Sequence, residues 1–471
     1  MRLGVPRRLM LTEGPIARTL LTFALPMLAG NVLQSLNGSV NAIWVGGFLG
    51  EAALTATSNS NTVMFLLIGS IFGVSMAATI LIAQHLGAQR LDEARRVVGS
   101  SASFFAVVSV AVAVLGVAFS DRILAAMHTP ADAMPLAHDY LRIIFVAIPF
   151  IFMYAFTMAV LRGAGDSRTP FMFLLLSVGL DIVLNPLFIF GVGPLPRLGI
   201  AGSALATLIA NIVSLAALLL YLYRRRHPLV LHRGETRLLR IDGAITATLV
   251  KKGVPMGLQM VVVSVSAILM LGLINQFGSH TTAGFAACMQ VWSYVQMPAF
   301  AMGAAVSSMA AQNVGAGRWD RVGRTAKAGV AFQTIVTAVS VALITFFARP
   351  LLGIFLPEGS PALATAVHLN LIATWSFIFF GVTMVLFGVI RSTGAVVVPL
   401  IILIVTLWAV RFPAAASLMG RYGEDAIWWS FPASSLLSML FAVLYYRYGG
   451  WRKARMTPAV VPRSSPSAAA E

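Results

Sequence analysis

Apolar positions along the chain occur in long runs that short polar segments separate. A helix needs about 20 apolar residues to cross the hydrocarbon core of a bilayer, and these runs are long enough to do so. The pattern therefore predicts an all-α polytopic membrane protein with twelve transmembrane helices. Their expected limits lie near residues 18–46, 54–83, 97–119, 136–161, 169–191, 199–223, 246–277, 282–311, 326–348, 363–390, 396–419 and 424–447.

The composition agrees with this pattern. Of the 471 residues, 58% are hydrophobic and only 10% are charged, and the mean hydropathy is +0.87. A soluble protein has no means of burying so much apolar surface. Cys288 is the single cysteine, so an intramolecular disulfide is excluded, and its side chain is expected to fill space between helices.

The basic residues follow the predicted topology. The formal net charge of +17 would also suit a nucleic-acid partner, but 27 of the 33 Lys and Arg residues fall on one side of the membrane, together with both termini. The remaining six are Arg122, Arg142, Arg197, Arg349, Arg411 and Arg421. The positive-inside rule then predicts that both termini are cytoplasmic, and it removes the expectation of a nucleic-acid partner. Arg far outnumbers Lys, as in bacteria with GC-rich genomes, so the expected location is the cytoplasmic membrane of a bacterium.

Three sequence matches indicate an internal duplication. They pair Pro26-Met27 with Pro255-Met256, AQHLGAQR (83–90) with AQNVGAGR (311–318), and LRGAGDSRTP (161–170) with IRSTGAVVVP (390–399). The matches keep their order and are 228 or 229 residues apart, which indicates that a six-helix unit has been duplicated. Because six is even, both units enter the membrane in the same direction, as in transporters whose two bundles rock around a site between them.

The duplication divides the chain into five parts. The expected parts are an N-terminal cytoplasmic segment (1–17), a first bundle (18–223), a basic cytoplasmic linker (224–245), a second bundle (246–447) and a cytoplasmic tail (448–471). The end of the tail is rich in Pro, Ser and Ala and is expected to be disordered. Two interpretations of the linker stay open, namely an anchor for the topology and a regulatory segment.

Asp181 is the only acidic residue well inside a predicted span. An ionised carboxylate in a bilayer costs about 2.5–3.5 kcal/mol on insertion scales, so such a residue is a candidate for function. Ser177, Asp181 and Asn185 are spaced by four residues and form one stripe along the fifth span. Pro186 follows them, where it removes a backbone hydrogen bond and frees a carbonyl oxygen.

Other polar residues within spans are candidates for a site around Asp181 and for a substrate cleft. They are Gln34, Asn37, Asn41, Thr207 and Asn211 in the first half, and Gln259, Gln290, Tyr294 and Arg411 in the second half. Arg411 lies near the position that corresponds to Asp181 in the repeat. Two alternatives stay open, because amides also hold helices together and Arg411 either lines the cleft or extends toward the membrane surface.

These features resemble the multidrug and toxic compound extrusion (MATE) family. The resemblance rests on the twelve spans, the paired AQxxGAxR loops, LRGAGDSRTP and NPLFIFG (185–191), and it covers about residues 15–448. It implies a V-shaped pair of six-helix bundles, alternating access, and export of organic, often cationic, compounds driven by inward H⁺ or Na⁺. It also implies a cation site, which maps here onto Asn41, Asp181, Asn185 and Thr207.

The chain departs from the family pattern at that site. Many prokaryotic members carry an acid where this chain has Asn41, and in their fifth span an Asn precedes Asp-Pro, whereas here Asp181 precedes Asn185-Pro186. One carboxylate therefore replaces two. Asp181 is expected to exchange H⁺, which we favour, or to bind Na⁺ together with neutral oxygen ligands, and no cofactor or other metal is expected.

Other functions fit the sequence less well. A lipid-linked precursor flippase of the same superfamily needs a strongly cationic cleft, for which Arg411 is the membrane-embedded candidate. A receptor or channel needs neither the repeat nor a solitary buried acid. An enzyme needs a Ser/His/Asp set or a His/Cys metal spacing at membrane depth, and the sequence has neither. The expected protein is a monomeric carrier of small organic substrates.

Overall fold

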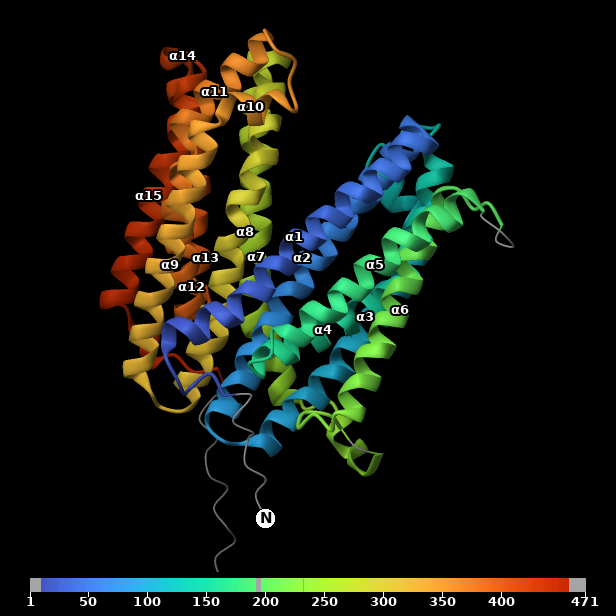
Figure 1. Ribbon diagram of the computed structural model, residues 1–471, viewed down its shortest axis with the longest axis vertical. Coiled ribbons are helices and arrows are strands. Elements are labelled where there is room, and N and C mark those ends of the chain that lie inside the picture. The colour runs from blue at the N-terminus through green and yellow to red at the C-terminus, as the bar shows by residue number, and fades with distance from the viewer. Residues whose placement is uncertain (1–9, 192–195, 232, 457–471) are drawn as a thin grey trace, which may run out of the picture.

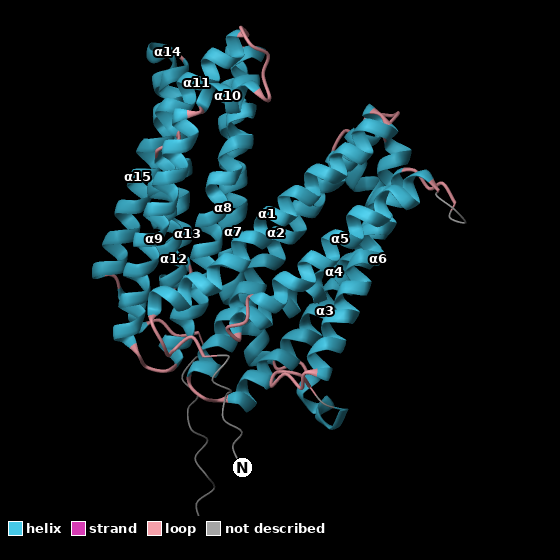
Figure 2. Cartoon of the chain, viewed as in Figure 1, coloured by secondary structure: helices cyan, strands magenta, loops and turns pink. Residues whose placement is uncertain are grey.

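Helices make up all the regular structure in residues 10–191, 196–231 and 233–456, which the computed structural model describes (Figure 2). A chain that crosses a bilayer must satisfy its backbone hydrogen bonds internally, which is why long apolar runs fold as helices. The helices of the first half are α1 (Ile16–Leu49), α2 (Glu51–Gly87), α3 (Leu91–Ala126), α4 (Met134–Gly163), α5 (Arg168–Phe190) and α6 (Ile200–Arg224). Those of the second half are α7 (Gly243–Ile274), α8 (Ser279–Gly315), α9 (Trp319–Phe346), α10 (Ala348–Gly353), α11 (Pro361–Ala373), α12 (Ser376–Arg391), α13 (Val397–Leu403), α14 (Phe412–Tyr422) and α15 (Glu424–Tyr448). A 3-10 helix, Arg233–Leu239, lies in the linker, and a π-helical segment, Ile404–Arg411, joins α13 to α14.

The predicted all-α membrane fold is confirmed, although the spans are divided differently. Within the described ranges, ten helices are long and apolar enough to cross a membrane, and α11 with α12 makes an eleventh span that is bent by 48°. The 37-residue α8 is long enough but lacks a sufficiently apolar stretch. It packs against helices of both halves, so protein rather than lipid surrounds much of it. The tail expected to be disordered lies outside the described residues from residue 457 on.

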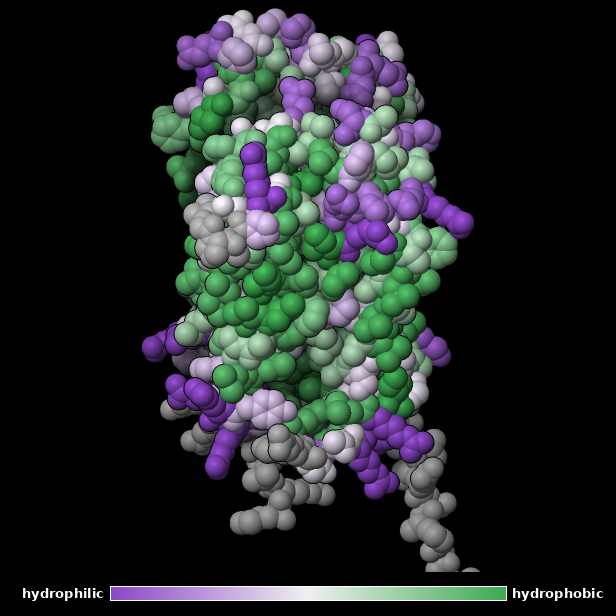
Figure 3. All heavy atoms as spheres, turned by 90° about the vertical axis from the view of Figure 1, so that its right-hand side faces the viewer, coloured by the Kyte–Doolittle hydropathy of each residue, from purple (hydrophilic) through white to green (hydrophobic). Residues whose placement is uncertain are grey.

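The two halves form bundles that meet at one end of the molecule and diverge at the other (Figure 1). The start of α1 and the linker after α6 lie at the end where the bundles meet. On the face shown in Figure 3, a hydrophobic band lies between two more hydrophilic ends, as expected of a protein that crosses a bilayer. This arrangement is the V shape that the family resemblance implied.

The helices α1 and α7 each begin beside the opposite bundle. Leu20 and Phe23 of α1 are buried in the same core as residues of α8 and α12. Conversely, Leu249 and Met256 of α7 belong to the core of the first half. In Figure 1, α1 accordingly runs from beneath the second bundle to the far end of the first. The expected domain boundaries follow the order of the helices along the chain. The first turns of α1 and α7, however, pack in the core of the opposite half.

The repeated AQxxGAxR motifs meet where the bundles join. A Cβ on Gly87 at the end of α2 would overlap the carbonyl oxygen of Gln312 in α8. Gly315 at the end of α8 stands in the same relation to Gln84 of α2. We call this contact between Gln84, Gly87, Gln312 and Gly315 the seam. Only a residue without a Cβ allows the two helix ends to approach so closely.

Two hydrogen bonds across the seam also correspond in the repeat. The Gln84 side chain donates to the carbonyl oxygen of Ser392 at the end of α12, at 2.6 Å. The Gln312 side chain donates to the carbonyl oxygen of Gly163 at the end of α4, at 3.1 Å. Ser392 and Gly163 occupy matching positions in the two repeated segments. The duplication has therefore produced a two-fold-related contact between the halves.

Candidate functional site

One face of α5 carries the polar stripe that the sequence predicts. Ser177, Asp181 and Asn185 are all buried, and Asp181 is 5% exposed. Their spacing of four residues places them on a common face of the helix, and α5 packs against α1 and α6. Asp181 is the only acid among the buried residues that the structure describes. Among the described residues, the acid that the sequence placed deepest in a span is therefore also the buried one.

Asp181 forms hydrogen bonds with two helices other than its own. Its Oδ2 accepts from Nδ2 of Asn37 on α1, at 3.1 Å. Its Oδ1 accepts from the hydroxyl of Thr207 on α6, at 2.9 Å. Hydrogen bonds to a charged acceptor are the stronger kind, so both contacts favour the ionised carboxylate. The carboxylate thus ties α1, α5 and α6 together.

Asn185 and Tyr140 add further polar groups beside Asp181. The Asn185 Nδ2 donates to the backbone carbonyl of Asp181 at 3.0 Å, and its buried Oδ1 has no hydrogen-bond partner in the described part of the chain. Tyr140 of α4 is 4% exposed and interacts electrostatically with the Asp181 carboxylate. Tyr140 is not among the residues that the sequence pattern predicted for this site. The available signal was a phenol within the predicted fourth span.

Other predicted residues of the first half lie nearby but make different contacts. Asn41 accepts a hydrogen bond from the Ser203 hydroxyl at 3.0 Å, and no hydrogen bond joins it to Asp181. Asn211 donates to the backbone carbonyl of Thr207 at 2.8 Å. Gln34 is exposed on α1. The contribution of α1 to the carboxylate therefore comes from Asn37, one helical turn before Asn41.

The predicted residues of the second half do not join this cluster. The buried Gln259 donates to the backbone carbonyl of Val396 at 3.4 Å. The Arg411 Nε donates to the Ser434 hydroxyl at 2.7 Å, and its guanidinium lies 4.6 Å from the ring centroid of Phe431. Both contacts hold Arg411 within the second bundle. Gln290 and Tyr294 are exposed on α8.

The atoms around Asp181 suit a small cation. The carboxylate and the unpartnered amide oxygen of Asn185 are oxygen acceptors, which H⁺ and Na⁺ both require. Transition metals prefer His and Cys ligands, and no group of three His, Cys, Asp or Glu residues able to hold a metal occurs in the described ranges. The donor set therefore fits exchange of H⁺ or Na⁺.

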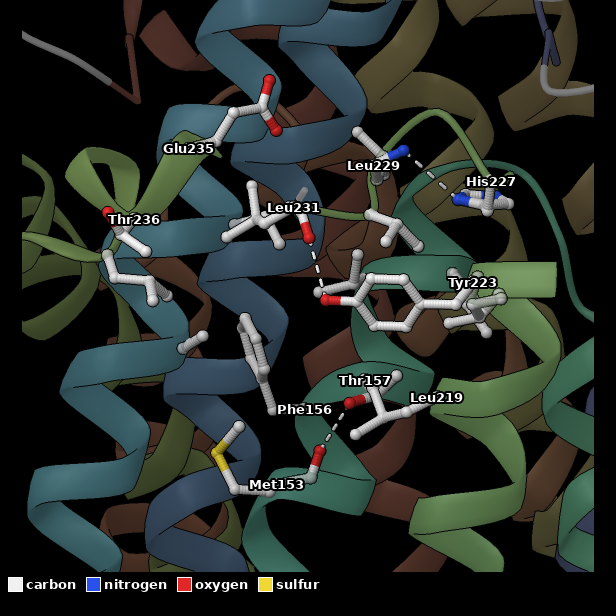
Figure 4. A pocket seen from close by; sticks show the side chains of 17 residues that line it. Met153, Phe156, Thr157, Leu219, Tyr223, His227, Leu229, Leu231, Glu235 and Thr236 are labelled. Carbon is white, nitrogen blue, oxygen red and sulfur yellow. Dashed lines mark hydrogen bonds between the residues drawn. The ribbon is translucent and has the colours of Figure 1, made fainter. Parts of the chain in front are cut away.

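A cavity of about 340 Å³ lies at the linker side of the first bundle (Figure 4). Asp181 is not among the residues that line it. Its lining is mostly apolar and comes from α3, α4, α6 and the linker. The Tyr223 hydroxyl donates to the Leu231 carbonyl at 2.8 Å, and His227 Nδ1 accepts from the Leu229 N–H at 3.3 Å. Burial lowers the pKa of His227, and the charge of Asp166 opposes this shift only in part. This lining favours an apolar guest over an ion.

Taken with the duplicated six-helix bundles, an acid that is the single buried one among the described residues is typical of multi-pass secondary transporters. The profile of the MatE family matches residues 26–187 and again residues 255–416, once in each half. The chain belongs to the MatE family. This confirms the resemblance to multidrug and toxic compound extrusion transporters.

Individual relatives agree with this assignment. The probable multidrug resistance protein YoeA of Bacillus subtilis is 37% identical over 443 residues, which cover 93% of this chain and 95% of the relative. The probable multidrug resistance protein YpnP of the same organism is 32% identical over 445 residues, covering 94% and 98%. A solved structure described as the outward-facing conformation of a multidrug resistance MATE family transporter has a TM-score of 0.86 at 20% identity, with coverage of 94% of this chain and 98% of that one. At that identity the structural likeness shows the fold alone.

Proposed function

We propose that the protein is a secondary antiporter that exports small organic compounds across the bacterial cytoplasmic membrane in exchange for H⁺ bound at Asp181. On this proposal it acts as a monomer, both termini are cytoplasmic, and Na⁺ is the alternative coupling ion. The observation that carries the proposal is the single buried acid, which is hydrogen-bonded to Asn37 and Thr207 on two neighbouring helices.

The helix α1 provides a path from this acid to the other bundle. Ionised Asp181 holds α1 through Asn37, and the first turns of α1 pack in the core of the second half through Leu20 and Phe23. Proton binding removes the negative charge and weakens the hydrogen bond to Asn37. A change of protonation at α5 thereby changes how α1 is held between the bundles, which is the differential contact that a two-state carrier requires.

The protonated site also has a ready acceptor. A neutral carboxyl group gains an O–H donor, and the Asn185 Oδ1, one helical turn away, lacks a partner in the described residues. An unpartnered buried acceptor costs free energy, so a donor that appears on protonation offsets that cost. The neutral carboxyl group then has a candidate acceptor on its own helix, which supports H⁺ over Na⁺ as the coupling ion.

The direction of coupling follows from the V shape. The bundles diverge at the end opposite the linker, so with a cytoplasmic linker this end faces the outside (Figure 1). Protons reaching Asp181 from outside weaken substrate binding and promote release. Loss of the proton to the cytoplasm restores the ionised site for the next substrate.

The test uses inverted membrane vesicles with separately imposed pH and Na⁺ gradients and the cationic dye rhodamine 6G. We expect dye accumulation with the pH gradient alone and none with Asp181→Asn. The matched control is Asp139→Asn, because the Asp139 side chain is 66% exposed and takes no part in the hydrogen bonds to Asp181.

Three results would contradict the proposal in different ways. Dye accumulation that depends only on the Na⁺ gradient would show that Na⁺, and not H⁺, is the coupling ion. Full gradient-driven accumulation by Asp181→Asn would remove Asp181 from the mechanism. Dye movement that ignores both gradients would indicate a channel instead of an antiporter.

A further inference from the structure

A second, smaller cavity lies where the two halves meet. It has a volume of about 60 Å³ and is lined by residues of α1, α2 and α4 from the first half and of α8 from the second. A water molecule takes about 30 Å³, so the cavity has room for a carboxylate or phosphate group but not for a whole drug-sized molecule. Met27, Phe72 and Met76 form an apolar part of the lining, and Phe72 is 43% exposed.

Arg162 brings a positive charge to this cavity. It stands in the last turn of α4 and is one of the lining residues. The carbonyl groups at a helix C-terminus tolerate a cation, which explains why an arginine can be placed there. In the described residues, these carbonyl groups accept no hydrogen bond from the Arg162 side chain, and no hydrogen bond or ion pair involves the Arg162 guanidinium. Five N–H donors therefore remain available to a guest.

The second half brings another positive charge to the same place. Arg391 corresponds to Arg162 in the repeat and is 8% exposed. Its Nε donates to the Phe387 carbonyl at 3.1 Å, and its Nη1 lies 3.9 Å from Sδ of Met76, which lines the cavity. No carboxylate of the described ranges pairs with either arginine. Two uncompensated guanidinium groups beside one cavity favour an anionic guest.

Two serine hydroxyls at the cavity also lack partners. Ser75 of α2 is 7% exposed and Ser307 of α8 is 1% exposed, and both line the cavity. Neither Oγ has a hydrogen-bond partner in the described part of the chain. Buried polar groups are usually satisfied, so an unpartnered hydroxyl from each half calls for an explanation. An oxyanion between the halves would accept from both.

We propose that this cavity binds an anionic group, a carboxylate or a phosphate, of the molecule that the protein transports. The inference rests on the proposed transport function and adds a substrate class to it. The anionic group binds to Arg162, and Met27, Phe72 and Met76 contact the apolar body of the substrate. Because Asp181 lies on α5 outside this cavity, the coupling ion and the anionic group have separate sites. Organic acids and zwitterions are then better substrates than cations that lack an acidic group.

A binding experiment tests the charge preference without any gradient. The full chain, purified in detergent, is titrated with carboxyfluorescein and rhodamine 6G, which share a xanthene ring but carry opposite charges. We expect Arg162→Gln to weaken carboxyfluorescein binding by about tenfold, as expected on losing a charge-assisted hydrogen bond. Rhodamine 6G binding should change by less than about twofold, since no anionic group engages the arginine.

Two variants and one competitor separate recognition from folding. Arg162→Lys keeps the charge and should retain most of the carboxyfluorescein affinity. Arg168→Gln removes an exposed arginine of the first turn of α5 and should leave the affinity for both dyes unchanged. Inorganic phosphate should compete with carboxyfluorescein and not with rhodamine 6G. Phosphate binding without any dye binding would assign the cavity to a free anion and overturn the proposal.

A labelling experiment reads the local charge without a ligand. With the single cysteine removed by Cys288→Ala, Phe72→Cys places one thiol at the exposed part of the lining. The anionic reagent MTSES should react faster than the cationic reagent MTSET, relative to their rates with a free thiol, and Arg162→Gln should reduce that preference. Equal effects of Arg162→Gln on both dyes, or no effect on the labelling preference, would overturn the proposal. Dye binding and thiol labelling need no ion gradient, so both can be measured even if gradient-driven transport fails. The anion-site proposal and the antiport proposal can therefore be refuted independently.

Discussion

The fifth and sixth spans of the two halves place opposite charges in matching regions. In the first half, Asp181 of α5 accepts a hydrogen bond from Thr207 of α6 at 2.9 Å. In the second half, Arg411 at the end of the π-helical segment donates to Ser434 of α15 at 2.7 Å. One copy of the duplicated helix pair thus carries a carboxylate–hydroxyl contact and the other carries a guanidinium–hydroxyl contact.

The difference separates a group that can change its charge from one that cannot. A guanidinium stays protonated in proteins, and Arg411 is also held against the face of Phe431. A carboxyl group can bind and release a proton. On the proposed mechanism, the first half therefore exchanges the ion while the second half keeps a constant charge.

The largest effect should come from removing each of these charges and measuring transport against pH. Asp181→Asn is expected to lower transport by about 10²-fold or more and to abolish its pH dependence, because the exchanging group is lost. Arg411→Gln is expected to keep transport within about threefold of the wild type and to leave the pH profile in place. Equal changes of the pH profile in both variants would show that the halves share the exchange.

The seam gives the next largest effect, and here the halves should behave alike. Gly87→Ala and Gly315→Ala each force a Cβ into a carbonyl group of the opposite half, and overpacking of this kind costs about 1–3 kcal/mol. Both should lower the thermal unfolding temperature by similar amounts. Gly323→Ala is the control, because nothing lies within 4 Å of the added Cβ. Clearly unequal decreases in unfolding temperature would show that the two halves of the seam contribute unequally to stability, although their geometry corresponds.

A smaller effect is expected from removing the hydroxyl groups that bind the two charged side chains, and the two variants should differ in the pH dependence of transport. Ser434→Ala leaves the Arg411 Nε without its side-chain acceptor and should cost about 1–3 kcal/mol of stability. Thr207→Val should cost a similar amount and should also shift the pH at which transport is half-maximal. Thermal unfolding and a transport pH profile of both variants check this. A pH shift in Ser434→Ala would contradict the assignment of exchange to the first half.

The smallest effect concerns the starts of α1 and α7. Asp242 caps α7 by accepting from the N–H of Ala244 at 2.9 Å, whereas α1 begins after Pro15 without a side-chain cap. Burial raises the pKa of Asp242, but the hydrogen bonds from Ala244 and Ile245 and the charge of Arg96 outweigh it and hold this pKa below its usual range. Asp242→Ala should therefore cost about 1 kcal/mol at pH 7.

The pH dependence of this cap has a defined sign. A carboxyl group whose pKa is lowered on folding stabilises the fold above its unfolded pKa of about 3.9, and the contribution is lost as the pH falls through the lower folded value. The difference in unfolding temperature between wild type and Asp242→Ala should thus be constant from pH 7 to pH 5 and shrink near pH 3. A difference that already disappears at pH 5 would contradict the lowered pKa.

Run length predicted the fold well because lipid allows few alternatives to a helix. It failed where the path of a span is set by packing. The run 363–390 forms α11 and α12 with a bend of 48° between them, yet the residues at the break, Ala373 to Ser376, include no Pro or Gly to announce it. The run 396–419 contains the π-helical segment, and Pro413, two residues after the end of this segment, removes a backbone donor there.

The candidate site was partly predictable for a similar reason. Asp181 was found because burial of an acid is costly and no other acid lies well inside a predicted span. Asn37 and Asn41 stand one turn apart on α1, so periodicity alone does not tell which one lies level with Asp181. Arg162 and Arg391 were assigned to cytoplasmic loops, but α4 and α12 extend to include them, and Arg391 is buried.

The crossing of α1 and α7 has a consequence for biogenesis. A ribosome delivers the chain from its N-terminus, so the first turns of α1 are made long before their packing partners in α8 and α12. Until the second half is synthesised, Leu20 and Phe23 have no final core to enter. The first six helices therefore cannot complete their tertiary structure alone, although domains of many chains fold one after another during synthesis. The first turns of α1 and of α7 thus reach their final packing only when both halves are present.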